Sequence, residues 1–173
     1  MRDPDIFLLL PATPLTHRHA RILRTIPVDH TIFCFRYPDF HHGLLSGPIT
    51  LTNIRDSHVD VRSVNGDVNL LNVSGSSLEV NSGSGRIKYD GDPGNLGEYL
   101  FTSHSGDLEI SIPAKALVEI KAQSLNGRVR SGLPSVNGLP AASQRNLLLK
   151  PGIVSASRFV LRSYRGAIHV KRP

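Results

Sequence analysis

The fold is decided by two stretches, Ser63-Val64-Asn65-Gly66-Asp67-Val68-Asn69-Leu70 and Ser103-His104-Ser105-Gly106-Asp107-Leu108-Glu109-Ile110. Each has a glycine, one spacer and then an apolar–polar–apolar triplet. The same unit begins at six glycines separated by steps of 19, 19, 21, 21 and 39 residues: Gly47, Gly66, Gly85, Gly106, Gly127 and Gly166. The copy at Gly127 is weaker, because Ser131 takes the place of its second apolar residue. The last step is close to two periods, which predicts a further copy near Asn146. A repeat of this length is typical of stacked architectures.

A second set of apolar pairs alternates with the first and shares its period of about twenty residues. The pairs are Val59/Val61, Leu78/Val80, Tyr99/Phe101, Val118/Ile120 and Phe159/Leu161. Alternation with period two places both apolar side chains of a strand on one face. A single pair of short strands cannot bury that face, whereas stacked copies form parallel ladders around a continuous interior.

The sequence therefore predicts an all-β parallel β-solenoid with two short strands per rung of about twenty residues. Six or seven rungs spaced by about 4.8 Å give a stack roughly 30 Å long. Polar residues between the apolar ones, such as Lys88 and Glu109, are expected to point outward. Seven glycines are expected at turns, where positive φ or close backbone approach favours glycine: Gly47, Gly66, Gly75, Gly85, Gly106, Gly127 and Gly166.

The repeat divides the chain into two parts. Residues 1–43 show no period and are interpreted as an irregular N-terminal segment that caps one end, with one short strand over Thr31–Tyr37. Residues 44–173 form the solenoid, interrupted by an irregular loop near 131–151 that contains Pro134, Pro140 and Pro151. Lys171-Arg172-Pro173 ends the last strand, and we expect these residues to protect a sheet edge from aggregation.

Charge is distributed unevenly along the chain. The formal net charge is +6, with +1 in residues 1–43, −5 in 44–120 and +10 in 121–173. Five arginines of the last part lie at or beside expected strands and are predicted to form a basic outer face that binds an anionic partner: Arg128, Arg130, Arg158, Arg162 and Arg165. Few aromatic residues accompany them, which argues against binding of single-stranded nucleic acid.

Other sites are excluded or disfavoured. A single cysteine, Cys34, excludes an internal disulfide, and the apolar run of residues 6–10 is too short to cross a bilayer. Ser103, His104 and Asp107 recur as a turn elsewhere without histidine, so a hydrolytic triad is not expected. The loop around Asp90 and Asp92 and the adjacent His41 and His42 lack the spacing of calcium or transition-metal sites. We therefore expect no catalytic residue, no cofactor and no metal.

The chain resembles the bacterial "putative adhesin" family DUF4097. The resemblance rests on the segments SVNGDV (63–68), NVSG (72–75), YDG (89–91), SHSGDL (103–108) with IPA (112–114), SLNG (124–127) and SYRGAI (163–168). It covers residues from about Gly43 to Pro173 and implies a parallel β-solenoid exported to the cell envelope or beyond. Residues 1–5 and the apolar segment interrupted by Pro11 lack the features of a secretory signal. A truncated start would reconcile the export that the resemblance implies with the lack of signal features in these residues.

Three functions remain open. The first is a non-catalytic cell-envelope module, an adhesin that binds anionic polysaccharide or another envelope component. The second is a self-associating scaffold in which the acidic middle of one copy meets the basic end of another. The third, a polysaccharide-active enzyme, is disfavoured because no pair of carboxylates is expected in a loop cleft.

Overall fold

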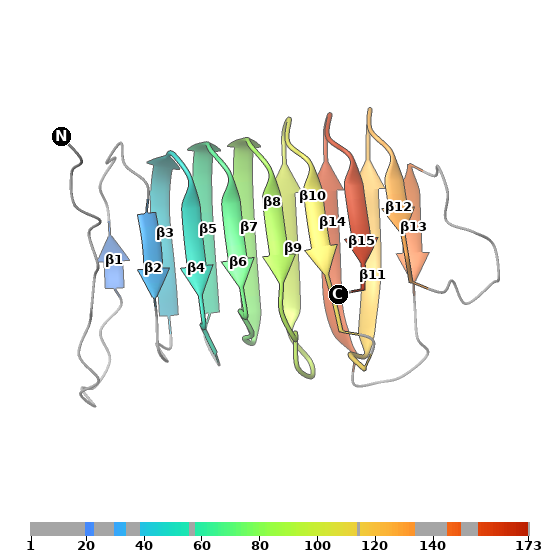
Figure 1. The fold of residues 1–173 in the computed structure, drawn as a ribbon, viewed down its shortest axis with the longest axis horizontal. Helices are drawn as coiled ribbons and strands as arrows, with labels where there is room; N and C mark the ends of the chain where they lie inside the picture. The colour runs from blue at the N-terminus through green and yellow to red at the C-terminus, as the bar shows by residue number, and fades with distance from the viewer. Residues whose placement is uncertain are drawn as a thin grey trace.

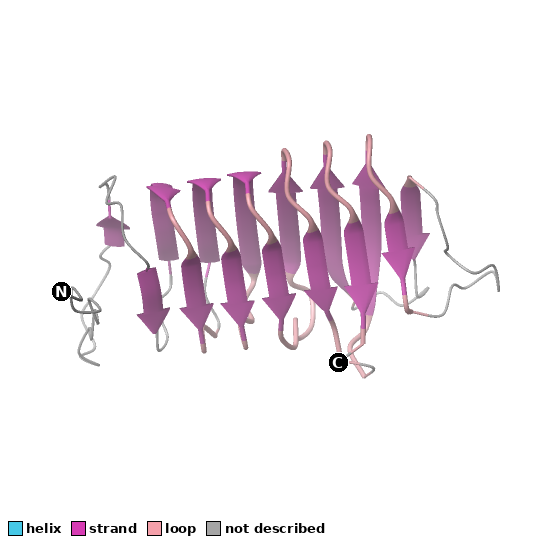
Figure 2. Ribbon diagram, turned by 45° about the horizontal axis from the view of Figure 1, so that its top comes forward, coloured by secondary structure: helices cyan, strands magenta, loops and turns pink. Residues whose placement is uncertain are grey.

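The protein is a flat two-layered stack of β-strands, seen from two directions in Figures 1 and 2. The computed structural model describes residues 20–22, 30–33, 39–55, 58–113, 115–133, 145–149 and 156–172. These residues contain no helix, and hence none that could span a membrane. The predicted all-β parallel solenoid is confirmed.

Two sheets face one another across the core. Sheet A contains β1 (Ala20–Ile22), β3 (Asp39–Ser46), β5 (His58–Asn65), β7 (Ser77–Ser84), β9 (Glu98–Ser103), β11 (Val118–Ser124), β13 (Asn146–Leu149) and β14 (Ser157–Ser163). Sheet B contains β2 (His30–Phe33), β4 (Ile49–Thr52), β6 (Val68–Leu71), β8 (Ile87–Asp90), β10 (Leu108–Ser111), β12 (Val129–Ser131) and β15 (Ile168–Lys171). Each rung consists of one strand of sheet A followed by one of sheet B.

The predicted ladders are present. Val68 lies beside Ile87, and Ile87 beside Leu108, in the parallel register of β6, β8 and β10. Buried and partly buried residues alternate along these strands, as a period of two requires. The parallel pairing also extends before residue 43, because β1 pairs with β3 and β2 pairs with β4. The rest of residues 1–43, Cys34 included, lies outside the described residues.

The rungs do not stack in the order of the sequence. Strand β14 lies between β9 and β11, and β15 lies between β10 and β12, so the C-terminal rung is inserted between its two predecessors. Figure 1 shows β14 and β15, the reddest strands, between β9 and β10 on one side and β11 and β12 on the other. The expected protection of a sheet edge by Lys171 is therefore wrong, because β15 is paired on both sides.

The copy predicted near Asn146 is also not a parallel rung. Strand β13 runs antiparallel to β11, with Lys121 opposite Leu148, and forms the end of sheet A. Strands β12 and β13 overlap the stretch 131–151 that the sequence indicated as an irregular loop, whereas residues 134–144 and 150–155 lie outside the described part.

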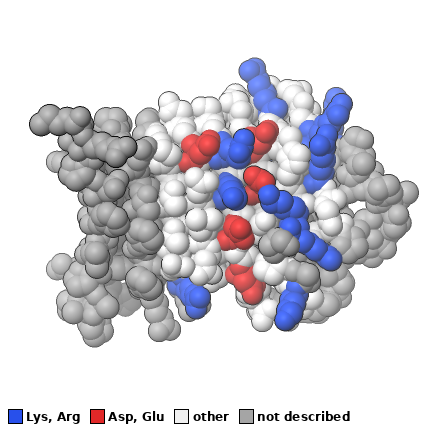
Figure 3. All heavy atoms as spheres, viewed as in Figure 1, with Lys and Arg blue, Asp and Glu red and all other residues white. Residues whose placement is uncertain are grey.

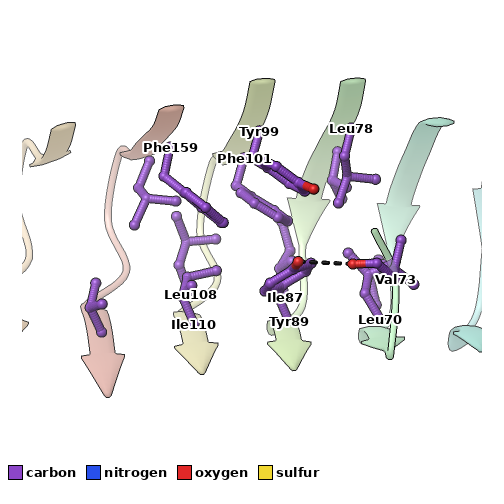
Figure 4. Close-up of a cluster of buried hydrophobic side chains, with 14 of the residues drawn as sticks. Leu70, Val73, Leu78, Ile87, Tyr89, Tyr99, Phe101, Leu108, Ile110 and Phe159 are labelled. Atoms are coloured by element: carbon purple, nitrogen blue, oxygen red, sulfur yellow. Dashed lines mark hydrogen bonds between the residues drawn. The ribbon is translucent and has the colours of Figure 1, made fainter. Parts of the chain in front are cut away.

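Aromatic side chains fill the middle of the core (Figure 4). Tyr99 and Phe159 stack with ring centroids 4.5 Å apart and planes 6° apart, and Tyr89 packs edge-on against both. The Tyr89 hydroxyl donates a 2.8 Å hydrogen bond to the carbonyl of Val73. Burial is the main cause that raises the pKa of Tyr89 well above its usual range.

The turn glycines stack backbone against backbone. Gly66 and Gly85 have φ of 110° and 114°, values that side chains disfavour. A Cβ added to Gly106 would lie 1.7 Å from the carbonyl oxygen of Gly85. A Cβ on Gly166 would lie 2.0 Å from the carbonyl oxygen of Gly106, which places the C-terminal rung directly on β9 and β10.

Candidate functional site

The five arginines predicted to bind an anionic partner lie on three surfaces. Arg158 and Arg162 are exposed on the outer face of β14 in sheet A. Arg130 is exposed on β12 in sheet B, whereas Arg128 and Arg165 lie in the turns before β12 and β15. Arg158 and Arg162 share one strand, where Arg158 forms an ion pair with Glu119 at 3.8 Å, and Arg128 and Arg165 lie in turns that stack on one another. The five do not form one face, and the binding role of the set stays a prediction.

The outer face of sheet B carries charges of both signs (Figure 3). Lys88 and Glu109 are neighbours in register, and Lys171 forms an ion pair with Glu109. The hydrogen bond from Lys171 is the main cause that lowers the pKa of Glu109. Because opposite charges neighbour one another, this face offers an anionic polymer little net attraction.

Sheet A ends in a row of buried serines that shapes the turns. Ser63, Ser82, Ser103, Ser163 and Ser124 follow one another in register across five strands. The hydroxyls of Ser103, Ser163 and Ser124 accept hydrogen bonds of 2.8–2.9 Å from the N–H of the glycine three residues later. The recurring Ser-x-x-Gly unit is therefore a turn held by its own side chain.

Two exposed rows flank the buried serines, and we call them together the turn strip. The residues before the serines form the polar row, which is Arg62, Asn81, Thr102, Arg162 and Gln123. The residues after them form the turn row, which is Val64, Gly83, His104, Tyr164 and Leu125. Neither row contains an acidic residue.

A hollow of about 530 Å³ opens in the turn strip over Gly83. Arg62 lines it from β5, and His104, Arg162 and Tyr164 line it from the two rungs that follow Gly83 in the stack. The rings of His104 and Tyr164 are parallel within 4°, with centroids 5.0 Å apart. The guanidinium of Arg165 lies 5.9 Å from the Tyr164 ring centroid.

The two arginines of the hollow differ in their surroundings. Arg62 forms an ion pair with Asp60 at 3.4 Å on its own strand. Arg162 is exposed and forms no hydrogen bond or ion pair with any residue in the described part of the chain. The guanidinium of Arg162 is therefore the group that a ligand anion would reach without displacing a partner.

The residues weighed as a hydrolytic triad have other partners. The Ser103 hydroxyl accepts from Gly106, the His104 ring stacks on Tyr164, and the Asp107 carboxylate accepts a 2.7 Å bond from the Ala167 N–H. Asp92 in the loop considered for calcium accepts from the Gly94 N–H at 3.0 Å. Among the described residues, no three His, Cys, Asp or Glu side chains are placed to hold a metal ion.

Sequence reasoning found Arg162 but missed the rest of the hollow. Asn81 and Thr102 belong to no motif of the sequence, Tyr164 belongs to the segment SYRGAI that carries the family resemblance, and His104 was weighed as a catalytic residue. The available signal was the Ser-x-x-Gly unit itself, because the residues on either side of its serine are exposed or half-buried in β5, β7, β9, β11 and β14 and the turns that follow them. That Tyr164 lies against His104 depends on the inserted rung, which the repeat period does not encode.

Comparison with curated proteins finds no match. Comparison with solved structures finds a similarity to a protein described as a putative cell adhesion protein from Clostridium sporogenes, with 18% identity and a TM-score of 0.46. The similarity covers 75% of this chain and 56% of that one, so the chain spans little more than half its length. The family model described as Toastrack DUF4097 matches residues 36–146. That match covers more than half of the chain, which belongs to the DUF4097 family.

Proposed function

We propose that the protein is a non-catalytic module of the bacterial cell envelope that binds extended anionic polymers, acidic polysaccharides above all, through the hollow in the turn strip. The observation that carries the proposal is the exposed guanidinium of Arg162, which has no acidic partner in the described part of the chain and lies in a hollow lined by Arg62 and two stacked rings. Guanidinium groups bind carboxylates through paired, charge-assisted hydrogen bonds.

The arrangement of the turn strip favours a long ligand. Side chains of the polar row repeat at the rung spacing of about 4.8 Å, so they present donors and acceptors at regular intervals along the stack. The absence of acidic residues from both rows removes the repulsion that a polyanion meets elsewhere on the surface. The chain belongs to the DUF4097 family, and the resemblance to that family implies an exported adhesin, which supports a role at the cell envelope.

Binding to immobilised polygalacturonate, with neutral dextran as reference, tests the proposal. Arg162→Gln is expected to weaken binding about tenfold, because a hydrogen bond to a charged group contributes about 1.5–3 kcal/mol. Arg158→Gln is the matched control: it lies on the same strand and the same face and removes the same charge, but it does not line the hollow.

Two results would overturn the proposal. Equal losses for Arg162→Gln and Arg158→Gln would mean that diffuse charge attraction, and not the hollow, holds the polymer. Release of reducing ends during incubation would show that the protein cleaves polysaccharide and is an enzyme.

A further inference from the structure

The turn row contains one residue without a side chain, Gly83. His104 follows Gly83 one rung along the stack, because its N–H donates to the Ser82 carbonyl at 2.9 Å and the Ser105 N–H donates to the Gly83 carbonyl at 3.1 Å. Tyr164 occupies the next rung, since its N–H donates to the Ser103 carbonyl at 3.0 Å. The imidazole of His104 is thus covered by a ring on one side and by a glycine position on the other.

The distance between the His104 and Tyr164 rings shows how thick a group one position of the turn row accommodates. The His104 and Tyr164 centroids lie 5.0 Å apart, close to the rung spacing of about 4.8 Å. One ring therefore occupies one rung, and the position over Gly83 is one rung wide. The hollow of about 530 Å³ includes this position and extends across the ends of β5, β7, β9 and β14, and its volume is within the range of pockets that hold small ligands.

The groups around this position are those that recognise a polar ring with a carboxylate. Thr102 supplies a hydroxyl, and Asn81 supplies an amide whose Nδ2 already donates a 2.9 Å hydrogen bond to Glu79 Oε1, so its carbonyl oxygen remains to accept from a sugar hydroxyl. Arg162 supplies a guanidinium that has no partner among the described residues, whereas Arg62 is already paired with Asp60. The open face of His104 suits the C–H face of a saturated ring better than it suits a charged group.

We propose that the hollow over Gly83 is a subsite for one uronic acid residue, whose ring stacks on the open face of His104 and whose carboxylate binds Arg162. Asn81 and Thr102 bind the ring hydroxyls. The subsite rests on the proposed function, because it assigns the sugar class that the turn strip takes from an acidic polysaccharide. It differs from general attraction of polyanions in requiring a single ring at a single rung.

Amide NMR of the isotope-labelled full chain, titrated with trigalacturonate and with the neutral galactose trisaccharide, tests the subsite. Shifts are expected at Gly83, His104 and Arg162 with trigalacturonate. His104→Ala is expected to weaken trigalacturonate binding several-fold, and Arg162→Gln about tenfold or more, which would remove the preference over the neutral trisaccharide. Leu125→Ala is the control: Leu125 is exposed in the same row but does not line the hollow.

The outcomes separate the subsite from the proposed function. If polygalacturonate binds but His104→Ala leaves trigalacturonate affinity unchanged, the subsite is wrong and the function stands. If trigalacturonate shifts Gly83 and His104 while the polymer does not bind, the subsite stands and the function fails. Tighter binding of adenosine monophosphate than of trigalacturonate would overturn the sugar assignment. His104→Leu keeps the bulk of the side chain without its ring, so it checks that any loss comes from stacking.

Discussion

The insertion of the C-terminal rung can be tested by the coupling between two core residues. Tyr99 on β9 lies directly beside Phe159 on β14, and Phe159 lies beside Ile120 on β11. If the rungs stacked in sequence order, Ile120 would contact Tyr99 and Phe159 would not. The substitutions Tyr99→Leu and Phe159→Leu, made singly and together, measure which neighbour Tyr99 has.

The expected coupling follows from the geometry of the pair. Their rings are parallel within 6°, with centroids 4.5 Å apart. Stacked aromatic pairs contribute about 0.5–1.5 kcal/mol beyond their buried area, so the double-mutant cycle should give a coupling in that range. A second cycle, Tyr99→Leu with Ile120→Val, should give less than about 0.5 kcal/mol, because the residues are two rungs and about 9.6 Å apart.

Urea unfolding followed by far-ultraviolet circular dichroism gives the free energy of unfolding of each variant. Tyr99→Leu removes the hydrogen bonds of the Tyr99 hydroxyl both in the wild-type background and in the Phe159→Leu background, so their contribution cancels from the coupling free energy. The inserted order is refuted if the coupling of Tyr99 with Ile120 exceeds that with Phe159. Equal, negligible couplings would refute the stacked aromatic core as described.

Three further predictions concern the turns and the surface, and each is measured by the free energy of unfolding. Gly106→Ala should cost several kcal/mol, since its Cβ would lie 1.7 Å from the carbonyl oxygen of Gly85 in the preceding rung. Gly132→Ala should be nearly neutral, because its Cβ would lie in ordinary contact, 3.7 Å from the carbonyl oxygen of Val170, and equal costs would contradict the backbone stacking. Ser163→Ala should cost about 1–3 kcal/mol, because it removes the buried acceptor of a 2.8 Å bond from a turn glycine, and no loss would contradict that role. Lys171 lowers the pKa of Glu109, so their pair stabilises the fold above the unfolded pKa of the carboxyl, and the contribution disappears as pH falls through the folded pKa. Lys171→Met should therefore reduce stability at pH 7 by less than about 1 kcal/mol and leave it unchanged at pH 2; a loss that persists at pH 2 would contradict the electrostatic cause.

Local pattern in the sequence predicts the rung but not its neighbour. Alternation fixes that Val68 and Leu70 point inward, and the common period fixes that rungs stack. Every rung, however, presents the same kind of ladder on both sides, so the period alone is satisfied by several orders. Side-chain volume distinguishes these orders. Strand β14 packs Phe159 against the aromatic residues of β9, whereas β11, with the smaller Ile120 and Ala122, lies nearer the end of the stack.

The order of the rungs also determines the candidate site. In a sequential stack Gln123 would follow Thr102 and Leu125 would follow His104, so the hollow would have neither a second ring nor an unpaired guanidinium. Insertion of β14 puts Arg162 and Tyr164 in those places. A result that moved β14 to the end of the stack would thus remove the proposed uronic acid subsite as well, which links the stability cycles to the binding measurements. Weaker uronide binding by Arg162→Gln and a measurable coupling between Tyr99 and Phe159 are therefore expected together, because both require β14 to lie beside β9.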